Sequence, residues 1–127
     1  MNMELSLKAI ALVASGGAIG ASLRYLTYVA LQGTDFPWAT LLVNLTGSFA
    51  LAFLLFYVIL DYHSDVVSFF VIMGVLGAFT TFSSFSMETL LLYMDKGLAA
   101  ATLNVTLNVG LCIAGAALGR FLALKII

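Results

Sequence analysis

Charged residues are scarce in this chain. Its 127 residues include five Lys or Arg and six Asp or Glu, so 9% of the sequence is charged while 63% is hydrophobic. Soluble domains are typically about 25% charged and about 45–50% apolar. The composition therefore predicts an integral membrane protein in contact with lipid. The net charge of −1 gives no basis for binding nucleic acid.

Cysteine, proline and histidine each occur once. With Cys112 alone, no intrachain disulfide can form. His63 lies between Asp61 and Asp65 in the only strongly polar linker, and these three residues do not complete a metal site within one chain. We expect a solvated loop histidine. Because the sequence shows no nucleophile–base pair, metal cluster or phosphate loop, we predict that the protein is not an enzyme.

Four long apolar segments take up almost the whole chain. A bilayer core about 30 Å thick needs about 20 apolar residues per helix. The predicted fold is therefore an all-α membrane protein, a single domain of four transmembrane helices over residues 1–127. The predicted spans are residues 5–31, 37–60, 66–94 and 98–127.

Polar residues interrupt the third segment. Between Gly77 and Glu88 the chain reads Ala-Phe-Thr-Thr-Phe-Ser-Ser-Phe-Ser-Met. Unpaired backbone groups cost several kcal/mol each in lipid, so a break there survives only when it is buried in protein or lines a polar path. We predict a helix break near residues 77–83 and place the functional site around it. Glu88 is the only candidate for an inward-facing carboxylate of a cation path, and the alternative is a capped or hydrogen-bonded acid.

Most polar residues inside the segments are hydrogen-bond donors. Thr40 and Asn44 share one helical face, and Asn104, Asn108 and Cys112 form a stripe with a spacing of four. Donors suit an anion, because they replace its hydration without a fixed positive charge that would hold it too tightly. The hydroxyl donors beside the break are Thr80, Thr81, Ser83, Ser84 and Ser86.

The break also carries aromatic rings and carbonyls. Phe79, Phe82 and Phe85 are spaced by three, which predicts that they lie near one helical face. Their ring edges carry partial positive charge and can point at an anion; the alternative is a plain hydrophobic stripe. Unwound carbonyls at this depth commonly coordinate a small cation such as Na⁺.

Small residues predict close contacts between helices. Gly16 and Gly20 form a G-x-x-x-G pair, and Gly115 and Gly119 repeat the spacing. We interpret the first pair as intramolecular packing. Arg24, inside the first segment, either faces protein or water in a functional role or reaches the membrane interface as an anchor.

Three motifs resemble those of the Fluc (CrcB-like) fluoride channels. They are Gly-Gly-Ala-Ile-Gly-Ala-Ser-Leu-Arg-Tyr at 16–25, Pro-Trp at 37–38 with Asn-Leu-Thr-Gly at 44–47, and the interrupted stretch at 74–89. The resemblance implies a dual-topology antiparallel homodimer in the inner (plasma) membrane, which exports cytoplasmic fluoride through two pores. It also implies a structural Na⁺ at the dimer centre, held by the backbone carbonyls of Gly77 and Thr80.

The resemblance further implies which side chains line the pore. Phe82, Phe85 and Asn44 match pore residues and Thr40 a vestibule hydroxyl, while the polar track of the last span maps onto Asn104, Asn108 and Cys112. With the two serines beside the break, the predicted fluoride path comprises Thr40, Asn44, Phe82, Ser83, Ser84, Phe85, Asn104 and Asn108.

Two other functions fit the size and span number. A small multidrug-type proton-coupled transporter would be built around a glutamate buried in its first span, but Glu4 precedes that span and Glu88 lies in the third. A non-transporting membrane subunit would use the polar stripe only to hold helices together. That reading explains the glycines but not the interrupted third segment.

The chain shows little charge bias to orient it in the membrane. With a cytoplasmic N-terminus, that side holds Lys8, Arg120 and Lys125, and the opposite side holds Lys96 and, if it reaches its nearer interface, Arg24. Orientation follows Lys/Arg asymmetry near span ends, so we predict insertion both ways up. A reporter fused to the C-terminus should be detected on both sides of the membrane, and detection on one side only would contradict dual topology.

Overall fold

The computed structural model describes residues 6–61 and 66–126, so the expected loop histidine His63 lies outside the described residues. Within these ranges the chain is helical and contains no strand. Four helical stretches are long and apolar enough to cross a membrane. The predicted all-α fold with four spans and a broken third helix is confirmed. Its elements are α1 (Leu7–Ala30), α2 (Trp38–Asp61), η1 (Val66–Leu76), α3 (Gly77–Phe79), α4 (Phe82–Lys96) and α5 (Leu98–Ile126).

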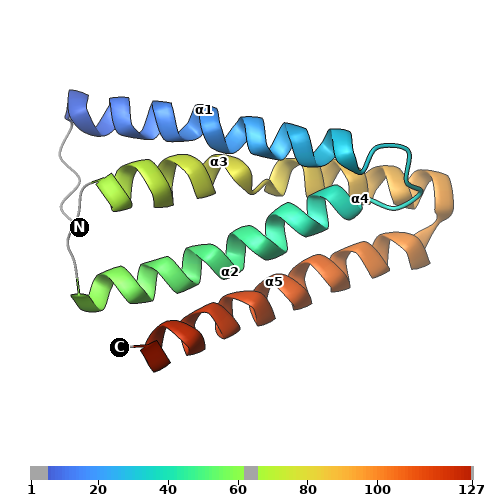
Figure 1. The fold of residues 1–127 in the computed structure, drawn as a ribbon. Helices are drawn as coiled ribbons and strands as arrows, with labels where there is room; N and C mark the ends of the chain where they lie inside the picture. The colour runs from blue at the N-terminus through green and yellow to red at the C-terminus, as the bar shows by residue number, and fades with distance from the viewer. Residues whose placement is uncertain (1–5, 62–65, 127) are drawn as a thin grey trace.

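The spans lie side by side along a common direction (Figure 1). The start of α1 and the end of α5 lie at one end of the bundle, and the α1–α2 and α4–α5 connections lie at the other. Along the bundle, α1 packs on η1 and α3, α2 packs on α5, and α4 packs on α5. The third span therefore contacts α1 before its break and α5 after it.

Glycines bring the helices into close contact. A Cβ built on Gly16 would overlap the carbonyl oxygen of Phe70, and one on Gly20 would overlap that of Val75. A Cβ on Gly74 would lie 2.9 Å from the Cα of Gly16. The G-x-x-x-G pair is thus an intramolecular packing surface, as the sequence indicates. Gly119 serves the same purpose between α5 and α2, where its Cβ would overlap the carbonyl oxygen of Phe49.

The third span is broken at two residues. Thr80 (φ −78°, ψ 157°) and Thr81 (φ −152°, ψ 116°) are extended and separate α3 from α4. This break corrects the expected phenylalanine face: Phe79 lies on α3 and Phe82 begins α4, so a helical spacing of three does not relate them. Gly47 of α2 makes room for the break, because a Cβ there would overlap the Thr80 methyl group.

The first part of the third span is a π-helix, η1, over Val66–Leu76. Its sequence, Val-Val-Ser-Phe-Phe-Val-Ile-Met-Gly-Val-Leu, is apolar on nearly every side. Because no polar face marks the period of such a segment, the sequence does not distinguish i→i+5 from i→i+4 winding.

Two neighbouring glycines of α1 provide a matched test of this packing. Gly20→Ala places a methyl group against backbone atoms of the third span and should destabilise the protein by about 1–3 kcal/mol. A Cβ at Gly17 meets only the Ala78 methyl group, at 3.9 Å. Gly17→Ala should therefore be neutral, or stabilising by up to about 1 kcal/mol through its higher helix propensity. Thermal unfolding of the purified protein measures both, and equal effects would contradict the packing argument.

Candidate functional site

The helix break is held by one side chain of α2. Asn44 Oδ1 accepts a hydrogen bond from the Thr81 backbone N–H at 2.8 Å, and Asn44 Nδ2 donates to the Thr81 carbonyl at 3.1 Å. One amide thus pairs with both backbone polar groups of the same extended residue. Because Thr81 is 6% exposed, this pairing stands in for bonds that water cannot supply.

The carbonyls of Gly77 and Thr80 are among those that lose their usual helical partners at the break. The Thr81 N–H, which in a continuous helix would bond to the Gly77 carbonyl, bonds to Asn44 instead. The Ser84 N–H, the helical partner of the Thr80 carbonyl, bonds to Thr81 Oγ1 at 3.2 Å and so caps the N-terminus of α4. Gly77 and Thr80, the predicted cation ligands, therefore each carry a carbonyl released from regular helix bonding.

A chain of hydrogen bonds leads from Asn44 along α5. Asn44 Nδ2 donates to Asn108 Oδ1 at 3.3 Å, and Asn108 Nδ2 donates to Asn104 Oδ1 at 3.0 Å. Asn104 Nδ2 donates to Thr89 Oγ1 at 2.8 Å, and Thr89 Oγ1 donates to the Phe85 carbonyl at 2.7 Å. The amides run in one direction, so their dipoles align. We call these five residues the amide ladder.

The ladder limits which donors can face an ion. Asn44 Nδ2 donates to Thr81 and Asn108, and Asn108 Nδ2 donates to the carbonyl and Oδ1 of Asn104. Since an amide has two N–H donors, both amides are fully used within the chain. The stripe predicted from the spacing of four does exist, but in this structure it connects α2, α4 and α5.

Most hydroxyls beside the break also donate within the chain: Thr80 to the Leu76 carbonyl, Thr81 to Ser84 and Ser86 to the Phe82 carbonyl. A hydroxyl proton can rotate to another acceptor, as the protons of a planar amide cannot, so hydroxyls are the donors there that can turn toward an ion.

A cavity of about 300 Å³ lies beside the break, and we call it the inner cavity. Phe85 is 8% exposed and Phe82 is 77% exposed; their ring centroids lie 5.4 Å apart with planes tilted by 56°. No charged side chain of the described residues lines the inner cavity. Its polar lining consists of Asn44, Ser48, Thr80, Thr81, Asn108 and Cys112.

A second polar cluster lies nearer the end of the bundle. Thr40 Oγ1 donates to Glu88 Oε1 at 2.8 Å and lies in short contact with the Tyr28 hydroxyl. Because the Thr40 proton goes to Glu88, the Tyr28 hydroxyl is the donor to Thr40. Glu88 is thus a hydrogen-bonded acid, which is one of the two alternatives. Its Oε2 atom is buried and accepts no hydrogen bond from the described chain.

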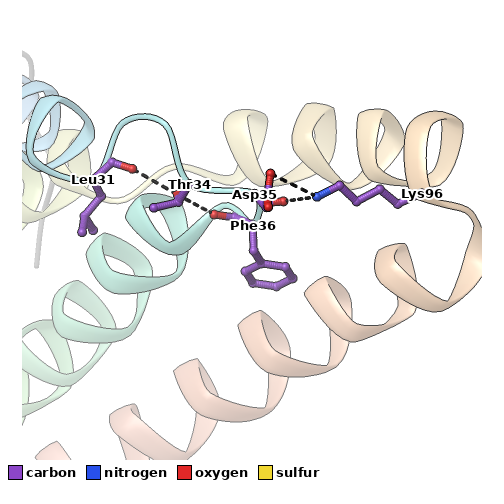
Figure 2. A network of polar contacts seen from close by, with 5 residues as sticks. All are labelled: Leu31, Thr34, Asp35, Phe36 and Lys96. Carbon is purple, nitrogen blue, oxygen red and sulfur yellow. Dashed lines mark hydrogen bonds and ion pairs between the residues drawn. The ribbon is translucent and has the colours of Figure 1, made fainter.

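This cluster opens onto a second cavity, of about 370 Å³, which we call the outer cavity. One wall is the α1–α2 connection, residues 31–37, and the other is the last part of α4. Tyr28 and Glu88 both line it, and Thr40 joins them. Figure 2 shows the connection beside the end of α4.

The other predicted site residues lie at the edges of this arrangement. Ser83 is exposed and Ser84 half-buried, and the hydroxyls of both lie within 3.3 Å of Thr81 Oγ1. Arg24 is half-buried, lines neither cavity and makes no hydrogen bond or ion pair within the described ranges.

Sequence reasoning missed three contributors. The Tyr28 hydroxyl hydrogen-bonds to Thr40, and Thr89 on α4 accepts the hydrogen bond that ends the amide part of the ladder. Gly47, with no side chain, leaves the space that the Thr80 methyl group occupies. A signal was available for Thr89, which lies four residues after Phe85, since this spacing shares a helical face.

Comparison with known proteins identifies the family. A model of the family described as "CrcB-like protein, Camphor Resistance (CrcB)" matches residues 11–120. A protein of Elusimicrobium minutum named "Fluoride-specific ion channel FluC" is 46% identical over 125 residues, covering 95% of this chain and 97% of that protein. Proteins of the same name from Shewanella amazonensis and Idiomarina loihiensis are 46% and 47% identical, covering 85% and 80% of this chain and 90% and 81% of their own lengths.

The range matched by the family model contains the helix break, both polar clusters and the greater part of each span. The chain is a multi-pass membrane protein and not an enzyme. It belongs to the CrcB-like family.

Proposed function

We propose that this protein is a fluoride-selective channel that exports cytoplasmic fluoride by passive conduction. The observation that carries the proposal is the inner cavity, which is lined by neutral polar groups and aromatic rings and by no charged side chain of the described residues. Without a fixed cation an anion can leave as readily as it enters, as conduction requires. The names of the relatives in Elusimicrobium and Shewanella agree with this choice of ion.

In this mechanism the residues divide into two groups. The hydroxyls beside the break and the edges of the Phe82 and Phe85 rings replace part of the ion's hydration. The amide ladder holds these groups in place, because it fixes the carbonyl of Phe85 and both backbone groups of Thr81. Thr40 and Glu88 lie on the approach from the outer cavity.

The complete pore requires two chains in this proposal. The inner cavity is open at its side, where Phe82 is 77% exposed and Ser83 is exposed. A second copy in the opposite orientation would cover this face and bring the two helix breaks together near a two-fold axis. Exposed hydroxyls at membrane depth favour such a protein contact.

The freed carbonyls fit a structural Na⁺ at that axis. Gly77 and Thr80 each present an oxygen released by the break. Two chains would bring four such oxygens together, a neutral ligand set of the kind that unwound helices offer Na⁺. A bound Na⁺ would supply positive charge where carbonyl dipoles converge.

Passive efflux from liposomes tests the function. Liposomes carrying the purified protein should lose fluoride rapidly, retain chloride and need no proton gradient. Preparations purified without Na⁺ should lose both dimer and flux. A proton-coupled transporter of the multidrug type would instead require the gradient, and a non-transporting subunit would give no fluoride loss in folded, Na⁺-containing dimers.

The phenylalanines are tested by isoleucine, which keeps the apolar bulk and removes the ring edge. Phe82→Ile and Phe85→Ile should each lower fluoride flux about two- to tenfold, because a ring-edge contact contributes about 0.5–1.5 kcal/mol. The dimer should stay assembled. Phe121→Ile, on the exposed side of α5, is the control. Unchanged flux in both cavity variants would remove the rings from the mechanism.

Asn44→Asp tests the residue that holds the break. The aspartate retains an acceptor for the Thr81 N–H but loses both donors and places a negative charge beside the inner cavity. Fluoride flux should fall by about tenfold or more, the effect of about 1.4 kcal/mol. Ser6→Asp, at the exposed N-cap of α1, should leave flux unchanged. A fully active Asn44→Asp variant would contradict the placement of Asn44 in the pore.

A further inference from the structure

One hydrogen bond joins the two walls of the outer cavity (Figure 2). Lys96 Nζ, at the end of α4, donates to the main-chain carbonyl of Asp35 at 2.6 Å. The Asp35 carboxylate contributes less, because its Oδ1 lies 3.9 Å from Nζ and its side chain is fully exposed. The contact is therefore mainly a charge-assisted bond to a carbonyl, between residues 61 positions apart in the chain.

The α1–α2 connection, to which Lys96 bonds, is stabilised by hydrogen bonds within itself. The Thr34 hydroxyl lies 3.1 Å from the Leu31 carbonyl oxygen and 2.9 Å from that of Phe36, which links both ends of the turn. The ring of Phe36 contacts that of Trp38, with centroids 4.7 Å apart. Residues 31–37 thus form a small unit, and Lys96 attaches this unit to the opposite wall.

The attachment lies at the mouth of the outer cavity. Lys96 and the connection line the cavity together with Tyr28 and Glu88, which meet at Thr40. A change in the separation of the walls would change how easily a solute reaches this cluster.

We propose that Lys96 is a positioning residue that fixes the width of the outer cavity and limits access to the Tyr28–Thr40–Glu88 cluster. Its role as a control on ion entry rests on the proposed channel function. The mechanical role does not, since it concerns only the distance between the connection and α4. Both parts can therefore be tested separately.

A cysteine in the cavity reports access directly. Ala39 lines the outer cavity and is 8% exposed, so Ala39→Cys adds a single sulfur there; Cys112→Ala removes the only native thiol. In detergent-purified protein, Lys96→Met should raise the rate of modification by neutral methyl methanethiosulfonate about three- to tenfold. The neutral reagent avoids any direct effect of the lost charge.

Matched variants separate the hydrogen bond from the charge. Lys96→Arg retains a cationic donor and should stay within about twofold of the parent rate. Asp35→Asn retains the main-chain acceptor and should do the same. Lys125→Met, at the other end of the bundle, should have no effect. An unchanged rate in Lys96→Met, or an equal rise in Lys125→Met, would overturn the proposal.

Two further measurements keep the test decisive. Thr34→Val leaves Lys96 intact but removes the hydroxyl that links the two ends of the connection, so it should also raise the rate of cysteine modification. If Lys96→Met does not assemble, an unchanged modification rate in Thr34→Val would overturn the proposal. Fluoride flux is measured on the protein with Ala39 and Cys112 unchanged, with and without the substitutions at Lys96, Lys125 and Thr34. Faster modification in a protein that conducts no fluoride would refute the channel function and leave the positioning role of Lys96 standing.

Discussion

The structure depends on one constraint: in lipid, every backbone polar group must find a partner within the protein. The third span violates helical bonding at Thr80 and Thr81, where the chain is extended. Asn44 satisfies this requirement by hydrogen bonding to both the N–H and the carbonyl of Thr81. Since these bonds come from another helix, the break is stable only while α2 stays in register with the third span. The gap that Gly47 leaves for Thr80 reinforces that register.

The amide ladder extends this restraint to the aromatic part of the site. From Asn44 it passes through two buried amides of α5 and ends at the carbonyl of Phe85 through Thr89. Three helices are thereby fixed around the inner cavity, and the two amides that line it, Asn44 and Asn108, donate all their protons within the chain. The two kinds of group therefore have different roles: the amides build the rigid frame, and the ring edges and the hydroxyls, whose protons can rotate to a new acceptor, can meet an ion.

Sequence reasoning predicted what depends on local pattern. The apolar composition predicted the four transmembrane spans, and the clustered hydroxyl residues predicted the position of the helix break. The G-x-x-x-G pair predicted close helix packing around Gly16. It failed where the outcome depends on contacts between distant segments. The face expected for Phe79 assumed a continuous helix, but the break falls immediately after it. The partner of Asn44 lies 37 residues away, and no periodicity in one helix identifies a partner in another.

One face of α2 connects all of these features. Thr40 contacts Glu88 at the outer cavity, and Asn44, one turn further, holds the break. Gly47 and Ser48, a further turn along, meet Thr80 and line the inner cavity. Because residues three and four apart lie on the same side of a helix, a small rotation of α2 would move all four contacts together. The position of α2 therefore determines the geometry of both cavities, and the close packing of α5 on α2 at Gly119 and the Asn44–Asn108 bond fix that position.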